Sequence, residues 1–228
     1  MTQPIAKVSD IIFVRFQLRD LGAQAEYLED FGMIAVTENA DANSIYYRGT
    51  GTDAYIYTAQ KGDADAFIAA GYEVNTIEEL EALAALQGAE IENGDAIIGG
   101  KMVRLTDPDG LGVEVYQGVN KSNPIDESVP VLNSGKQKKR LNETQRFGNG
   151  ADEWEIDSAG NMRYALPSSV MRLGHTAINV SNGPVSIQWY HDVLGMIVSD
   201  NIIAPDGNVG GAFIRCDNGD MPSDHHTL

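Results

Sequence analysis

The first half of the chain consists of short hydrophobic runs separated by clusters of Gly, Asn and Asp. Residues 11–18 (IIFVRFQL) have the composition of a β-strand, and residues 21–32 place hydrophobic side chains at helical spacing before ending at Gly32. This pattern predicts one β-α-β-β-β unit. Its remaining strands are expected in three short runs bounded by turn-forming residues, at 33–38, 44–49 and 52–59.

The same order of elements then repeats. A helix should begin after Thr76, which forms a capping box with Glu79, and should stop at Gly88. Asp and Gly in the sequence DPDG predict a tight turn at 107–110. The elements expected in this second unit are a strand at 66–74, the helix, and strands at 101–107 and 112–118.

Residues 119–170 break this pattern, because they combine several prolines with a basic run and long polar stretches. A loop of this length is unusual inside a compact domain, so we interpret the segment as a linker. The chain is therefore expected to divide into an N-terminal domain (residues 1–118), the linker (119–170) and a third unit (171–228).

The third unit repeats the first. Residues 27–36 match residues 189–200 around a shared Gly-Met, which places His175 opposite Ile12 and His226 opposite Tyr55. The elements expected here are a strand at 172–180, a helix at 183–196, strands at 197–203 and 210–216, and the start of another strand at 224–228.

Composition narrows the possible environments and partners. The net charge of −17 disfavours nucleic acid and anionic membrane surfaces as partners. The basic run at 136–140 is interpreted as a solvated loop. No apolar stretch is long enough for a membrane span, and the N-terminus lacks the layout of a signal peptide. With a single cysteine, Cys216, no intrachain disulfide can form, and a cytoplasmic location is expected.

Candidate chemistry rests on few residues. A histidine on an apolar strand is either a packed core residue or a functional one, and the pattern alone leaves both open for His175 and His226. His225 should face the opposite side of its strand. His191, on a helix position expected to be exposed, is assigned no role. Two further residues are expected to be structural, Glu114 as an acid without histidine partners and Cys216 as a buried strand residue.

Three segments carry a resemblance to a known family: RLGHTAIN…WYHDVLGM (172–196), GAFIRC…DHHTL (211–228) and LTDPDGLGVEVYQG (105–118). They resemble the vicinal oxygen chelate superfamily, which includes the glyoxalases, and within it the type I extradiol ring-cleavage dioxygenases. The resemblance implies an α+β fold of repeated βαβββ modules that form cupped mixed sheets. The DPDG segment indicates the fold, whereas GH followed later by HHT is more specific to the dioxygenases.

The resemblance also implies a site. Such enzymes hold Fe(II), with Mn(II) also possible, through two His and one Glu, and use O₂ to open a catecholic ring. His175 matches the first metal ligand, and His226 matches the acid-base residue beside the bound oxygen. The second His and the Glu belong to a fourth unit, which this sequence lacks. We therefore expect a C-terminally truncated chain that is inactive alone and binds iron weakly.

Two other functions remain open from the sequence. One is a non-catalytic binding or scaffold member of the superfamily, and the other is a glyoxalase-like isomerase or lyase, which the HHT segment disfavours. The expected partners are a small aromatic substrate and further copies of the chain in a homo-oligomer. Because the third unit lacks a companion, residues 171–228 should pair with another copy, pack on the N-terminal domain or be poorly ordered.

Overall fold

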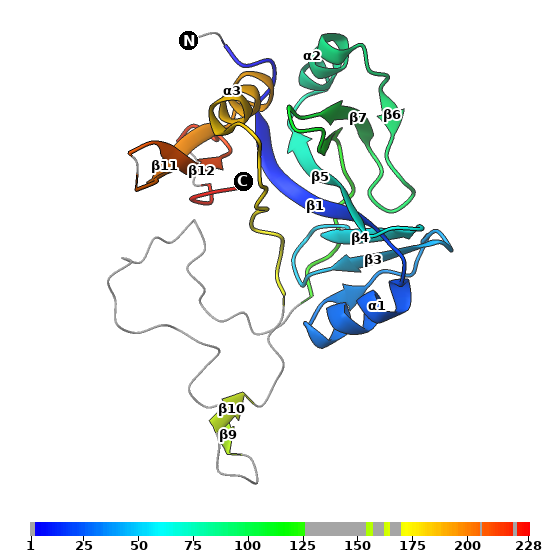
Figure 1. The fold of residues 1–228 in the computed structure, drawn as a ribbon. Helices are drawn as coiled ribbons and strands as arrows, with labels where there is room; N and C mark the ends of the chain where they lie inside the picture. The colour runs from blue at the N-terminus through cyan, green and yellow to red at the C-terminus, as the bar shows by residue number, and fades with distance from the viewer. Residues whose placement is uncertain (1–2, 126–153, 157–161, 165–169, 206, 221–222) are drawn as a thin grey trace.

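A single eight-stranded mixed sheet contains both N-terminal modules, in the order β2-β3-β4-β1-β5-β8-β7-β6 (Figure 1). The structure is a computed structural model that describes residues 3–125, 154–156, 162–164, 170–205, 207–220 and 223–228. The elements of the two modules are β1 (Val8–Leu18), α1 (Leu21–Asp30), β2 (Ile34–Ala35), β3 (Ser44–Arg48), β4 (Tyr57–Lys61), β5 (Ala66–Val74), α2 (Ile77–Gln87), β6 (Glu92–Asn93), β7 (Lys101–Thr106) and β8 (Gly112–Gln117).

The first strand of each module joins the two modules into one sheet. β1 pairs in parallel with β4, the last strand of its own module, and antiparallel with β5, the first strand of the next module. β5 in turn pairs in parallel with β8. The α+β fold of repeated modules that the sequence predicts is confirmed.

Local sequence signals explain most of these elements. The predicted capping box at the start of α2 is present, with Thr76 accepting from the Glu79 N–H and the Glu79 side chain accepting from the Thr76 N–H. Gly88 ends the helix in the left-handed region at φ 61°, as a C-terminal glycine should. Asp20 caps the start of α1, and its side chain accepts from the N–H groups of Gly22 and Ala23.

Two predicted strands of the first module have different bounds. The run at 52–59 becomes β4 only from Tyr57, because Tyr57 pairs with Val14 of β1 and Tyr47 of β3 at the start of the regular ladder. The run at 33–38 forms only the two-residue β2. β6 was not predicted, because its two exposed polar residues carry no hydrophobic pattern.

The third unit contains α3 (Gly183–Leu194) and an antiparallel pair, β11 (Ile197–Ile203) and β12 (Val209–Arg215). Asn182 caps α3, and Gly195 ends it at φ 68°. A Cβ at Gly195 would also lie 2.7 Å from the Ala6 carbonyl oxygen, so this position requires glycine on two grounds.

The strand predicted at 172–180 is wrong, since these residues are not assigned to any sheet. Their backbone has too few partners among the described residues to form a ladder. Thr176 N–H donates to the Thr227 carbonyl at 3.1 Å, and Thr227 N–H donates to the Ile214 carbonyl at 2.7 Å. The end of the chain therefore lies between residue 176 and β12 without a regular strand of its own.

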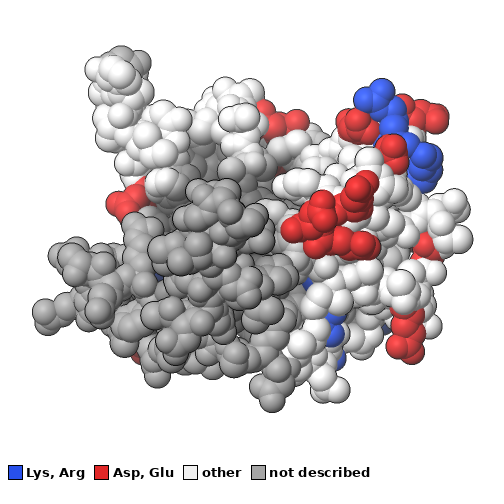
Figure 2. All heavy atoms as spheres, turned by 90° about the horizontal axis from the view of Figure 1, so that it is seen from below, with Lys and Arg blue, Asp and Glu red and all other residues white. Residues whose placement is uncertain are grey.

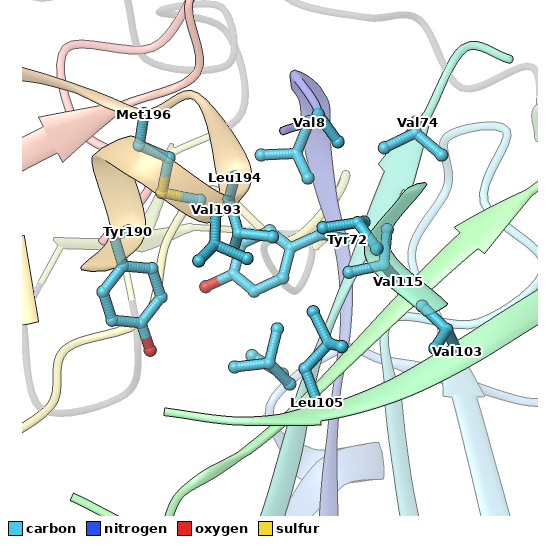
Figure 3. Close-up of a cluster of buried hydrophobic side chains, with 14 of the residues drawn as sticks. Val8, Tyr72, Val74, Val103, Leu105, Val115, Tyr190, Val193, Leu194 and Met196 are labelled. Carbon is cyan, nitrogen blue, oxygen red and sulfur yellow. The ribbon is translucent and has the colours of Figure 1, made fainter. Parts of the chain in front are cut away.

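The third unit packs on the N-terminal modules, one of the three outcomes expected for it. Figure 3 shows Tyr72 of β5 projecting toward α3, where it lies in one buried cluster with Val193 and Leu194. Tyr72 and Leu194 are fully buried. The hydrophobic cores of the two parts are therefore continuous.

The DPDG turn fixes the start of α3 to the second module. Asp109 accepts from the Ser181 N–H at 2.8 Å and from the Ser186 hydroxyl at 3.3 Å. Asp107 accepts from the Tyr190 hydroxyl at 3.2 Å. A carboxylate at a helix N-terminus is favoured by the helix dipole, so this turn stabilises the docked helix as well as closing a hairpin.

Thr50 contacts both ends of the predicted linker (residues 119–170). The Ile125 N–H donates to the Thr50 carbonyl at 2.9 Å, and the Thr50 N–H donates to the Val170 carbonyl at 2.8 Å. The linker residues 126–153, 157–161 and 165–169, including the basic run at 136–140, lie outside the described residues. Between them β9 (Trp154–Ile156) pairs antiparallel with β10 (Met162–Tyr164).

The surface is predominantly acidic, as the net charge of −17 requires. Figure 2 shows acidic side chains in several patches on one face of the described part, with fewer basic side chains among them. Within the ranges that the structure describes, no helix has the length and apolar character needed to cross a membrane.

Replacing Leu194 by Ala tests the shared core. The side chain is 0% exposed within a cluster drawn from both parts of the chain, so Leu194→Ala should lower the free energy of unfolding by about 2–5 kcal/mol. Urea denaturation would measure the change. Val185→Ala, at a position on the same helix that is 49% exposed, is the control and should change it by less than about 0.5 kcal/mol. Equal effects of the two substitutions would contradict the packing described.

Candidate functional site

A pocket of about 420 Å³ lies inside the third unit. Its walls come from the irregular stretch at 175–180, from α3, from β11 and β12, and from the end of the chain. His175 and His226 both line it, with their ring centroids 4.2 Å apart. The Phe213 ring of β12 lies 4.9 Å from the His226 ring. The structure thus brings together the two residues that the sequence singled out.

Two sets of contacts hold the segments that carry these histidines. The backbone bond from Thr176 to Thr227 joins the residues that directly follow His175 and His226. Nearer the start of each segment, the Arg172 Nη2 donates to both carboxylate oxygens of Asp224, at 2.7 and 2.6 Å. An ion pair to a guanidinium with such short distances restricts orientation as well as distance. The relative position of the two histidines therefore depends on both sets.

The surroundings of His226 favour its neutral form. Partial burial lowers its pKa, and the neighbouring His175 and His225 lower it further, because a second positive charge nearby is unfavourable. The Asp224 carboxylate acts in the opposite direction. A histidine whose pKa is lowered in this way is unprotonated at neutral pH and can accept a proton there.

His225 is exposed and does not line the pocket, as expected of a residue outside the site. It has a partner that the sequence did not indicate, since its Nε2 lies 2.8 Å from Asp200 Oδ2 on β11. Its Nδ1 lies 3.4 Å from the Nδ1 of His226. Only the pairing of β11 with β12 brings Asp200 to this end of the unit, so no local sequence signal could have revealed the contact.

Two other candidates lie away from the pocket. His191 on α3 is partly buried rather than exposed, and its Nδ1 lies 2.9 Å from Asp192 Oδ1. Cys216 is 2% exposed, and burial raises the pKa of its thiol to about 11. The expectation of a buried cysteine is confirmed, although Cys216 lies just after the end of β12 and not within the strand.

The N-terminal modules hold an ion pair in place of histidines. Ile12 and Tyr55, which align with His175 and His226, are both buried. Glu114 accepts from Arg15 Nη2 at 3.2 Å and from the Tyr116 hydroxyl at 3.0 Å. Glu114 is 3% exposed, so its contacts fit the structural role expected from the sequence.

The surroundings of Arg15 in the N-terminal modules stabilise its charged form. Burial opposes the charged guanidinium, but Glu114 and the tyrosines Tyr55 and Tyr116 outweigh it and raise the pKa of Arg15 above its ordinary value. The Tyr55 hydroxyl donates to Asp95 at 2.7 Å and so extends the network. Arg15 was not singled out in the sequence, because nothing local distinguishes it from an exposed strand arginine.

A complete metal site is not present among the described residues. They contain no group of three or more His, Cys, Asp and Glu side chains placed to hold a metal ion. His175 and His226 line one pocket, but no third His, Cys, Asp or Glu among the described residues joins them in a group that could hold a metal ion.

Substituting Glu114 by Gln should destabilise the N-terminal modules. The side chain of Glu114 is 4% exposed and that of Arg15 17%, so removing one charge leaves the other buried without its partner, at a cost of about 3–5 kcal/mol. Chemical denaturation gives the value. Glu92→Gln removes a carboxylate from the exposed pair with Arg104 and should cost no more than about 1 kcal/mol. A smaller loss for Glu114→Gln than for Glu92→Gln would refute this role.

Nuclear magnetic resonance titration of the histidine rings should show His226 losing its proton below the ordinary pKa of 6.5. Replacing His225 by Gln removes a like charge and should raise that pKa, whereas Asp224→Asn removes an attractive charge and should lower it further. A midpoint for His226 above 6.5 in the unmodified chain is the result that would count against this electrostatic picture.

Comparisons with known proteins agree with this fold. Residues 172–225 match the family model described as the Glyoxalase/Bleomycin resistance protein/Dioxygenase superfamily. The search of curated proteins found no match.

Solved structures with the same fold are distant in sequence. The chain is similar to the Mn(II)-bound glyoxalase from Novosphingobium aromaticivorans, with a TM-score of 0.65, 20% identity and coverage of 97% of this chain and 61% of that one. A variant of homoprotocatechuate 2,3-dioxygenase from B. fuscum gives a TM-score of 0.65, 18% identity and coverage of 94% and 52%. For a catechol 2,3-dioxygenase the values are 0.60, 20%, 98% and 66%.

The chain therefore spans between about half and two thirds of the length of these structures. At such identities the likeness establishes the fold, and the family model adds a match in sequence over the segment that contains His175. The resemblance found in the sequence is confirmed at the level of the superfamily: the chain has the vicinal oxygen chelate fold, and its residues 172–225 carry a module of the glyoxalase, bleomycin resistance protein and dioxygenase superfamily.

Proposed function

We propose that this chain carries part of the site of a metal-dependent extradiol dioxygenase, which uses O₂ to open a catecholic ring. In this proposal the N-terminal modules (residues 1–118) support the third unit (residues 171–228), whose histidines act on the substrate. His175 is a metal ligand and His226 is the acid-base residue. The observation that carries the proposal is the meeting of these two rings, 4.2 Å apart, in one pocket.

The pocket suits a small aromatic molecule. Its volume of about 420 Å³ lies in the usual range for small-molecule sites. Apolar side chains such as Ile187, Ile202 and Phe213 form much of its wall, and the histidines supply polar groups on one side. A flat ring with two adjacent hydroxyl groups can place its apolar edge against the apolar side chains and its hydroxyls toward the histidines.

His226 can move protons for such a substrate. Its lowered pKa leaves a free ring nitrogen at neutral pH, which can accept a proton from a hydroxyl of the bound ring. The imidazolium formed in this way can return the proton later. Because its surroundings disfavour the charged form, His226 gives the proton up readily.

The metal is the incomplete part of this proposal. Three protein ligands are usual for a site of two His and one carboxylate, and no such group exists among the described residues. The described residues therefore do not by themselves fit bound iron, and His175 is at most one ligand of a set completed from outside them. Dioxygenases and a Mn(II)-bound glyoxalase among the similar structures support a divalent metal, with Fe(II) as our choice.

A non-catalytic binding module is the second candidate. The observation that favours it is the same lack of a complete ligand set in the part of the chain that is described. The N-terminal modules, which hold the buried Arg15–Glu114 pair, support it further, because a module of this fold need not carry metal-binding histidines. Such a protein would bind an aromatic ligand in the pocket without altering it.

Catechol binding to the purified chain tests the shared premise of both functions. In the absence of metal, catechol should shift the ring signals of His175 and His226 and the amide signals of β12, measured by nuclear magnetic resonance. His226→Gln should weaken binding, and His191→Gln, at a histidine that does not line the pocket, is the matched control. Catechol shifts confined to residues outside the pocket would exclude both functions.

Iron binding separates the two candidates. The chain should bind Fe(II) weakly and well below one ion per chain under anaerobic titration, because the described residues contain no complete ligand set. His175→Ala should abolish the residual binding, whereas His191→Ala should leave it unchanged. Residual binding that survives His175→Ala would remove the support for a metal ligand at this position and leave the binding module as the better account.

A further inference from the structure

Three side chains form a row that leads from the surface to the pocket. Asp200 of β11 lies 2.8 Å from Nε2 of His225, and Nδ1 of His225 lies 3.4 Å from Nδ1 of His226. His226 in turn lines the pocket beside His175. The row therefore connects an exposed carboxylate to the ring that we assign as the acid-base residue.

The hydrogen-bonding capacity of these groups fixes which nitrogen carries each proton. An ionised carboxylate only accepts hydrogen bonds, so Nε2 of His225 is the donor to Asp200. In a neutral imidazole the other nitrogen is then an acceptor, and in His225 this is Nδ1. A hydrogen bond to it requires a proton on Nδ1 of His226. The lone pair of neutral His226 is consequently on Nε2, the nitrogen directed away from His225.

We propose that Asp200 and His225 are positioning residues that set the tautomer of His226, so that its Nε2 is the nitrogen that accepts and returns protons in the pocket. This role rests on the function proposed for His226. It resembles the general arrangement in which a carboxylate orients one imidazole nitrogen and leaves the other free for chemistry, here with a second imidazole placed between them.

Exposure argues against a purely stabilising role for the row. The side chains of His225 and Asp200 are 58% and 67% exposed. Pairs this exposed contribute little to folding, because water screens them and both side chains lose freedom when they are held together. Their effect on the distribution of protons in His226 does not require a large contribution to stability. Substitutions at Asp200 and His225 should accordingly leave the chain folded.

The tautomer can be read directly in the full chain. Two-bond proton–nitrogen correlation spectra of histidine-labelled protein distinguish the Nδ1–H and Nε2–H forms, at a pH about two units above the usual histidine pKa. His226 should be predominantly the Nδ1–H form and His225 predominantly the Nε2–H form. Asp200→Ala and His225→Phe should each remove this predominance and give a mixture for His226. Asp200→Asn, which keeps one acceptor oxygen, should restore part of it.

The second Asp–His contact in the chain provides the control. Asp192→Asn should change the spectrum of His191, whose Nδ1 lies 2.9 Å from Asp192, and leave that of His226 unchanged. Two results would overturn the proposal. One is a predominant Nε2–H form of His226 in the unmodified chain, and the other is a predominant Nδ1–H form of His226 that persists in both Asp200→Ala and His225→Phe. The measurement needs neither catechol nor metal, so its outcome is independent of the tests of the proposed function.

Discussion

The burial of α3 against the N-terminal sheet is the contact on which the rest of the third unit depends. A helix and two strands cannot bury enough apolar surface to be stable alone. Here α3 contributes Val193 and Leu194 to a core that already contains Tyr72 of β5 and the inner face of α2. The pocket adjoins this core, because Tyr190 and Ile214 belong to the buried cluster and also line the pocket. The residues around the two histidines are therefore ordered by a core that is mostly built from the N-terminal modules.

The site itself is held by few interactions. The segment that carries His175 has no regular ladder. The segment that carries His226 is joined to its neighbours by the backbone bonds of Thr227 and Leu228 with Ile214, by the Thr176–Thr227 bond and by the Arg172–Asp224 pair. Segments with few backbone partners open more readily than core strands. The two histidines proposed to act on the substrate therefore lie on segments with few backbone partners, whereas the eight-stranded sheet carries neither of them.

The sequence predicted the elements whose signals are local. The capping box of Thr76 and Glu79, the terminal glycine Gly88 and the strand at 66–74 all appear where expected. The predicted strand at 172–180 was wrong because strand formation also depends on partners distant in sequence. These residues have the composition of a strand but lack neighbouring strands to pair with. The meeting of His175 and His226 could be anticipated only through the internal repeat and the resemblance.

The remaining contacts of the site could not be predicted for the same reason. Asp200 reaches His225 through the register of β11 with β12, and Arg15 meets Glu114 because β1 and β8 both flank β5. Neither pair has a characteristic spacing along the chain. The sequence identified Glu114 as a structural acid, but its partner became apparent only in three dimensions.

The contacts of Thr50 affect how well the molecule tolerates changes in the length of the segment between Ile125 and Val170. Its carbonyl and its N–H bond Ile125 and Val170, so the intervening segment departs and returns at one residue. The entropy of closing such a loop rises only slowly with length, by about 0.6 kcal/mol for each doubling. The modules on either side should accordingly keep their relative position if that segment is shortened, lengthened or replaced. The segment is therefore a suitable place to insert a reporter or an additional domain.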